Sequence, residues 1–112
     1  MPAPEAALRL LGLAARAGAL VAGTERVREA VRAGRAAYVV VAADASANSR
    51  GKLLPLLTAR GVPHAVALDR HALGSAVGRG PLSAIGLTDA SFAGRVRELL
   101  QAAGRTESCS RG

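Results

Sequence analysis

Residues 38–43, which read YVVVAA, constrain the fold of this chain more than any other segment. The run is rich in β-branched side chains and has no polar position, so it predicts a strand that is covered on both faces. Such a strand needs helices packed on each side of its sheet. The run ends at Asp44, and ligands of open α/β sheets usually bind where strands end in this way.

The segments around this strand alternate between helical and extended patterns. Apolar residues three and four apart predict helices at residues 5–17, between Thr24 and Gly34, and at 47–60, 70–77 and 92–103. Short apolar runs predict strands at residues 19–22, 38–43, 64–68 and 84–88. The order predicts an α/β fold, a three-layer α/β/α sandwich with a small mixed sheet of about four strands. We expect one domain over residues 1–103, with Gly104 ending the last helix and residues 104–112 forming a disordered tail.

Side chains that can cap a helix precede most of the predicted helices. In chain order, the candidate caps are Thr24, Ser46 or Asn48, Asp69, and Asp89 or Ser91. Pro55 lies in the middle of the third predicted helix, where proline removes a hydrogen bond and clashes with the preceding turn. We therefore expect a kink or two short helices there.

Basic side chains outnumber acidic ones by 15 to 8 in this chain of 112 residues, which gives a formal net charge of +7. Such a surplus on a small domain favours a polyanionic partner, most often nucleic acid. All but Lys52 of the basic residues are arginines, and arginine makes forked contacts to phosphate and guanine. Codon usage in a GC-rich genome explains the preference for arginine equally well, but it does not explain the net surplus.

Several classes of protein are excluded by composition. The only aromatic residues are Tyr38 and Phe92, too few to stack a row of single-stranded bases. One cysteine, Cys109, cannot form a disulfide framework, and His64 and His71 have no obvious third ligand for a metal. No run is long and apolar enough to span a membrane, and the start does not read as a signal peptide, so we expect a cytoplasmic protein with no membrane partner.

Motifs that carry catalysis or bind cofactors are absent. The sequence has no P-loop, no dinucleotide fingerprint, no GxSxG and no HExxH. Asp44 ends a strand as some phosphoryl-transfer carboxylates do, but only Asp69 and Asp89 follow it in the later loops. A small enzyme that uses Asp44 is the least favoured hypothesis, and we expect no enzyme, no cofactor and no small-molecule substrate.

Three polar segments are expected to meet at one end of the sheet: residues 23–26, 44–46 and 78–81. The first exposes backbone N–H groups at a helix N-terminus, where phosphates bind. Arg26 can fork onto a guanine edge, and Glu25 can accept a hydrogen bond from a base. On the same helix, pairs three residues apart can form ion pairs, namely Glu25 with Arg28 and Glu29 with Arg32.

These motifs together resemble a known family. The segment LLGLAARAGALVAGTERVREAVRAGRAAYVVVAADAS, followed by VP, ALGSAVGRG and a late TD-x-x-F, is similar to the kink-turn RNA-binding family of ribosomal proteins, and most to its bacterial YlxQ-like branch. The similarity runs over residues 8–100. It implies an α/β/α sandwich that binds structured RNA in translation or ribosome assembly, with the ribosome or translation factors as further partners.

In family members that bind kink-turns, the segment after the first strand reads Gly-Thr-Asn-Glu-x-x-Lys. Gly23 and Thr24 match this pattern, while Glu25, Arg26 and Glu29 replace its Asn, Glu and Lys. A carboxylate at position 29 repels phosphate, and an arginine at position 26 exchanges a hydrogen-bond acceptor for a donor. The resemblance therefore implies RNA binding more directly than it implies a kink-turn target.

The RNA-binding residues expected from the sequence and the resemblance come from the same three regions. They are Gly23, Thr24, Glu25, Arg26, Glu29, Asp44, Ser46, Arg50, Lys52, Gly78, Arg79, Gly80 and Leu82. Among these residues, Gly78 and Gly80 have no side chain and would let the backbone approach RNA closely. The alternative to RNA binding is a protein–protein adaptor on translation or RNA-processing factors, because Glu25 and Glu29 weaken the usual RNA site.

Overall fold

The computed structural model describes residues 3–108 and contains one four-stranded sheet. Its strands are β1 (Leu20–Ala22), β2 (Tyr38–Val41), β3 (His64–Val66) and β4 (Ala84–Leu87), in the order β1-β4-β2-β3. Strand β4 is antiparallel to both β1 and β2, while β2 and β3 are parallel. The predicted small mixed sheet is confirmed.

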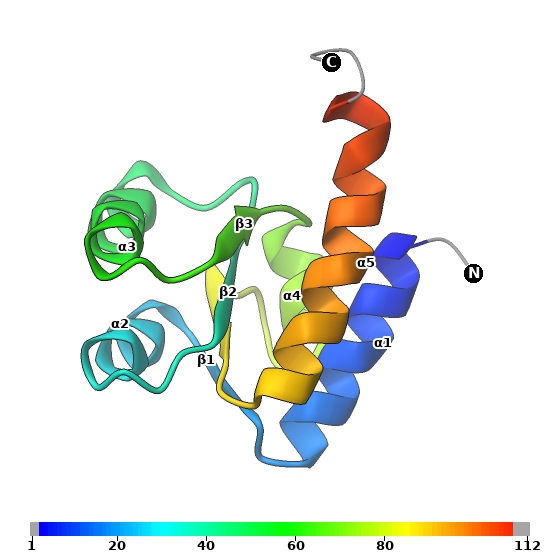
Figure 1. The fold of residues 1–112 in the computed structure, drawn as a ribbon, viewed down its shortest axis with the longest axis horizontal. Helices are drawn as coiled ribbons and strands as arrows, with labels where there is room; N and C mark the ends of the chain where they lie inside the picture. Colours follow the sequence, from blue (N-terminus) through cyan, green and yellow to red (C-terminus); the bar gives the residue numbers. More distant parts are fainter. Residues whose placement is uncertain (1–2, 109–112) are drawn as a thin grey trace.

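Five helices cover the two faces of this sheet. They are α1 (Ala3–Arg16), α2 (Thr24–Arg32), α3 (Ala47–Arg60), α4 (Arg70–Ala76) and α5 (Ala90–Ser108). Helices α2 and α3 lie on one face, and α1, α4 and α5 lie on the other (Figure 1). The three-layer α/β/α sandwich predicted from the sequence is therefore the observed architecture.

The central strands are buried as their composition predicts. All four residues of β2 are buried, and Val39, Val40 and Val41 are fully inaccessible to solvent. In β4, Gly86 lets α2 pack closely, since a Cβ there would lie 3.2 Å from the side chain of Val21 and 3.5 Å from that of Val27. The apolar core is thus continuous from α2 through the sheet to α1 and α5.

Three of the candidate caps do cap helices. Ser46, Asp69 and Asp89 each accept a hydrogen bond from a backbone N–H in the first turn of the helix that follows, at 3.1, 2.7 and 2.8 Å. Ser46 and Asp89 are therefore used in preference to Asn48 and Ser91. The prediction for Thr24 is wrong, because Gly23 is the N-cap residue of α2 and Thr24 is already helical.

Two further expectations differ from the structure, at Pro55 and at the end of β3. Of the two outcomes expected at Pro55, two short helices do not form, since α3 continues through Pro55 as a single helix. Pro55 and Gly51, four residues earlier, are both exposed, so the Gly51 carbonyl that loses its intrahelical hydrogen bond can be solvated instead. Strand β3 ends at Val66, because Leu68 adopts a left-handed conformation with φ 65° that no strand accommodates.

The last helix is longer than predicted. It continues through Gly104 to Ser108, so Gly104 does not end it. Glycine in a helix interior costs about 1 kcal/mol relative to alanine, which is too little to stop a helix whose earlier turns are packed on the core. The remainder of the predicted tail, residues 109–112, lies outside the described residues.

Candidate nucleic-acid interface

The three predicted loops meet at one edge of the sheet. Because β4 runs antiparallel between β1 and β2, the start of β4 lies beside the carboxyl ends of both neighbours. The Gly23 amide donates to the Ala84 carbonyl at 3.0 Å, and the Ala42 amide donates to the Ser83 carbonyl at 2.8 Å. We call this edge the loop rim and define it as residues 23–26, 44–46 and 78–82. Its existence confirms the predicted clustering.

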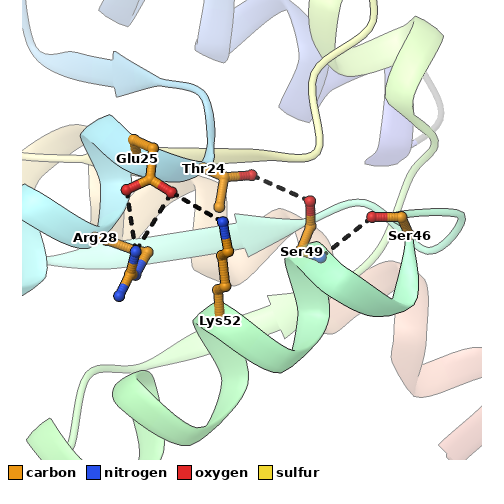
Figure 2. Close-up of polar contacts among 6 residues, drawn as sticks. All are labelled: Thr24, Glu25, Arg28, Ser46, Ser49 and Lys52. Carbon is orange, nitrogen blue, oxygen red and sulfur yellow. Dashed lines mark hydrogen bonds and ion pairs between the residues drawn. The ribbon is translucent and has the colours of Figure 1, made fainter.

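Helix α2 points its N-terminus at the loop rim. Gly23 holds φ 101° and ψ 151°, a conformation that disfavours any residue with a Cβ. No side chain among the described residues caps the helix, so the amides of its first turn are free to bind a ligand. Thr24 instead donates its hydroxyl to the Ser49 hydroxyl of α3 at 3.4 Å (Figure 2).

Glu25 gathers two cations next to this helix end. Its carboxylate lies 3.0 Å from the guanidinium of Arg28 and 3.4 Å from Nζ of Lys52, which comes from α3 (Figure 2). Desolvation raises the pKa of Glu25, while the charges and hydrogen bonds of Arg28 and Lys52 lower it by more, so the net pKa lies below its ordinary value. We call Glu25, Arg28 and Lys52 the cation cluster.

The cation cluster is partly predictable. The spacing of Glu25 and Arg28 predicts their ion pair, and the structure confirms it. The corresponding pair of Glu29 with Arg32 does not form within the described residues. Arg28 is not among the site residues predicted from the sequence. Lys52 is among them, but nothing in the sequence showed that Lys52 would contact Glu25, 27 residues away.

Asp44 connects the loop after β2 to the start of α4 through contacts with Arg70. Its carboxylate accepts a hydrogen bond from the Arg70 amide at 2.9 Å and lies 3.5 Å from the Arg70 Nε. The hydrogen bond from the Arg70 amide is the main cause that lowers the pKa of Asp44, with the Arg70 side chain adding to it against a smaller opposing desolvation. Arg50 donates to the carbonyl of Ala43 in the same loop. Asp44 and Arg50 thus hold the backbone of the loop, and Ser46 caps α3.

The third loop, residues 78–82, packs against α4 at Gly74, which is not among the site residues predicted from the sequence. A Cβ on Gly74 would lie 2.0 Å from the carbonyl oxygen of Gly80, so only glycine fits there. The Arg79 amide also donates to the Gly74 carbonyl at 2.8 Å, and Gly78 adopts φ 76°. Leu82 packs partly against the core.

Two arginines of the loop rim remain free. Arg26 and Arg79 are exposed, and neither makes a side-chain hydrogen bond or ion pair with the described residues. Glu29 is exposed on the next turn of α2. The rim therefore combines free helix amides with two unpaired guanidinium groups, and the cation cluster lies beside it. Together these groups can bind phosphates and base edges.

The sequence matches a known family over most of its length. Residues 5–95 fit the model of the ribosomal protein L7Ae/L30e/S12e/Gadd45 family. The chain belongs to this family. Two curated relatives are named RNA-binding protein YlxQ. The one from Bacillus subtilis is 34% identical over 91 residues, covering 81% of this chain and 91% of the relative. The one from Enterococcus faecium is 33% identical over 95 residues, covering 85% and 91%.

Two solved structures superpose on this L7Ae-family chain over most of its length. A protein of unknown function from Bacillus halodurans superposes with a TM-score of 0.81 at 37% identity, covering 85% of this chain and 96% of that one. A 15.5 kD RNA-binding protein from Giardia lamblia superposes with a TM-score of 0.73 at 25% identity, covering 90% and 84%. The family resemblance expected from the sequence motifs is confirmed.

Two further properties of the L7Ae-family chain concern other kinds of partner. In residues 3–108, no helix combines the length and the apolar character that crossing a membrane requires. The same part of the chain holds no group of three or more His, Cys, Asp or Glu side chains that are close enough to bind a metal ion.

Proposed function

We propose that this protein binds structured RNA through the loop rim, as a cytoplasmic factor of translation or ribosome assembly. The observation that carries the proposal is the junction of β1, β2 and β4, which brings the α2 N-terminus and two free arginines to one edge. The names of the YlxQ relatives and of the Giardia protein support the same function. All of these names describe binding, and we propose no catalytic activity.

In this proposal, different groups of the rim and of the neighbouring cation cluster contact phosphates and bases. The amides of α2 and the ammonium group of Lys52 suit phosphate oxygens, because they present fixed donors or a point charge. Arg26 and Arg79 carry forked donors that match the O6 and N7 atoms of guanine. The rim segments contain no aromatic residue, so folded RNA, read by its backbone and groove edges, suits this rim better than stacked single strands.

The type of structured RNA differs, in our proposal, from the kink-turn bound by other family members. Arg26 presents donors where those proteins present a carboxylate, and Glu29 presents an exposed carboxylate where they present a lysine. Lys52 supplies a cation to the same end of α2 from the neighbouring helix. We therefore expect ribosomal RNA segments of another shape to bind more tightly than a standard kink-turn.

The experiment that tests this proposal measures affinity for ribosomal RNA fragments between about 50 and about 300 mM salt. Wild-type protein should bind with an affinity that falls linearly in a double-logarithmic plot. Arg26→Ala and Arg79→Ala should each lose about 1–3 kcal/mol of binding free energy if the side chains read bases, and less if they touch only phosphate.

Arg95→Ala is the matched control. It removes an exposed arginine from α5, which lies on the face of the sheet away from α2 and α3. This variant should bind RNA as the wild type does. Absence of binding at the lowest salt, or equal affinity in all three variants, would count against the loop rim. Protein partners that co-purify after nuclease treatment, without any RNA affinity, would instead support the adaptor function.

A further inference from the structure

A groove with a volume of about 940 Å³ runs between α1 and α4. These two helices lie on the face of the sheet away from α2 and α3 (Figure 1). Small and aliphatic residues of both helices line it, among them Leu8, Gly12, Ala72 and Ala76. The two helices are in close contact at its base, because a Cβ on Gly12 would lie only 2.8 Å from the Ala76 carbonyl oxygen. The groove is therefore an open channel whose floor lies where the two helices touch.

A large apolar side chain stands exposed in this channel. Leu13 is 53% exposed, and the described residues have only one other exposed large hydrophobic, Val66 at 46% on strand β3. Leu13 lines the groove, whereas Val66 does not. Leu13 alone would be an ordinary surface residue. It matters here because it lies in a groove that other aliphatic residues and two arginines also line.

Charged residues border the channel in a regular pattern. Arg9 and Arg16 both line it and are seven residues apart on α1, which is two helical turns or about 10.5 Å along the axis. Leu13 lies between them. Glu5 lies one turn before Arg9 and is the acidic residue among the described lining residues. The border thus has two positive positions followed, towards the start of α1, by one negative position.

We propose that this groove binds an acidic amphipathic helix of a protein partner. A helix in a groove presents apolar anchors at positions i, i+3, i+4 and i+7, which match a channel with Leu13 at its centre. Carboxylates two turns apart on the partner would pair with Arg9 and Arg16. Glu5 disfavours a third carboxylate at that end and so sets the direction in which the partner helix lies.

RNA suits this groove less well than a protein helix. None of its described lining residues is aromatic, so it offers no platform on which a base can stack. Both helices contribute aliphatic residues to its lining, whereas the arginines are confined to one wall, on α1. Gly78 belongs both to the groove and to the loop rim, so a helix bound here would lie next to RNA on the rim. The chain would then join an RNA to a protein.

The test is a selection for binding to the full-length protein. The library consists of displayed helical peptides whose surface positions are randomised. Enriched peptides should carry apolar residues at helical spacing with acidic residues beside them. Peptides made from these sequences should bind two variants at least about tenfold more weakly than the wild type. The variants are Leu13→Glu and the double variant Arg9→Glu with Arg16→Glu.

Two variants control for charge and for lost apolar surface. Val66→Glu and Arg35→Glu alter an exposed valine and an exposed arginine outside the groove, and both should bind the peptides normally. The RNA affinity of Leu13→Glu should equal that of the wild type. Selection without enrichment, basic consensus peptides, or peptides that bind Leu13→Glu equally well would overturn the proposal. So would an RNA affinity that falls with Leu13→Glu, or self-association that this variant abolishes.

Discussion

Nζ of Lys52 lies 3.4 Å from Oε2 of Glu25, so a lysine of α3 is held beside the first turn of α2 (Figure 2). The lysine side chain is 42% exposed and that of the glutamate is 64% exposed. An ion pair this exposed contributes about 0–1 kcal/mol to stability, so its main consequence is where it keeps the ammonium group. That position is next to the free amides at the N-terminus of α2.

Lys52→Ala should weaken RNA binding while leaving the free energy of unfolding nearly unchanged. Loss of one phosphate contact should also reduce the slope of log affinity against log salt by about 0.7–0.9. Binding titrations at several salt concentrations measure both effects. Arg60→Ala, which removes a cation from the last turn of the same helix, should leave the slope as it is. An unchanged slope in Lys52→Ala would place this residue outside the RNA contact.

Gly74→Ala should displace the loop of residues 78–82, because the new Cβ would lie 2.0 Å from the Gly80 carbonyl. Overpacking of this kind costs about 1–3 kcal/mol, and the shifted loop should also lower RNA affinity. Urea unfolding and RNA titration measure the two effects. Gly94→Ala on α5 is the matched control, since beyond its chain neighbours and the backbone of its own helix no atom of the described residues lies within 4 Å of its Cβ position. That variant should gain stability by about 0.5–1 kcal/mol.

Asp44 should make stability depend on acid pH. Its hydrogen bond from the Arg70 amide lowers the pKa of its carboxyl in the folded state. The contribution is therefore complete above the ordinary carboxyl value of about 3.9 and is lost as the pH falls through the lowered pKa. Asp44→Asn should be less stable than the wild type at neutral pH, and this difference should shrink below about pH 4. Urea unfolding at a series of pH values would show a constant difference if the argument were wrong.

Ser46→Ala should destabilise the protein by about 1 kcal/mol, because Ser46 accepts the hydrogen bond from the Ser49 amide at the start of α3. Asn48→Ala changes the other candidate cap, which the helix does not use, and should have a much smaller effect. Thermal unfolding of the two variants compares them directly. Equal losses of stability would mean that the cap assignment is mistaken.

Much of the fold followed from local sequence pattern. The buried run at Tyr38–Val41, the helical spacing of Val27, Ala30 and Val31, and the caps at Asp69 and Asp89 all depend on residues close together in the chain. The expectations of two short helices at Pro55 and of a helix end at Gly104 are wrong for the same reason. Each residue weakens a helix locally, but the packing of the neighbouring turns on the core outweighs that weakness.

The sequence alone determined that the chain alternates helices with short strands, that its central strand is covered on both faces, and that three loops carry polar residues, two of them with glycines. Only the tertiary structure decided the pairs that build the rim: Glu25 with Lys52, Asp44 with Arg70, and Gly74 against Gly80. Periodicity and capping act within a few residues of the chain. The first two pairs, by contrast, join residues 27 and 26 positions apart. Asp44 meets Arg70 because β2 and β3, the strands that precede them, pair in parallel, and Glu25 meets Lys52 because α2 and α3 pack side by side on one face of the sheet.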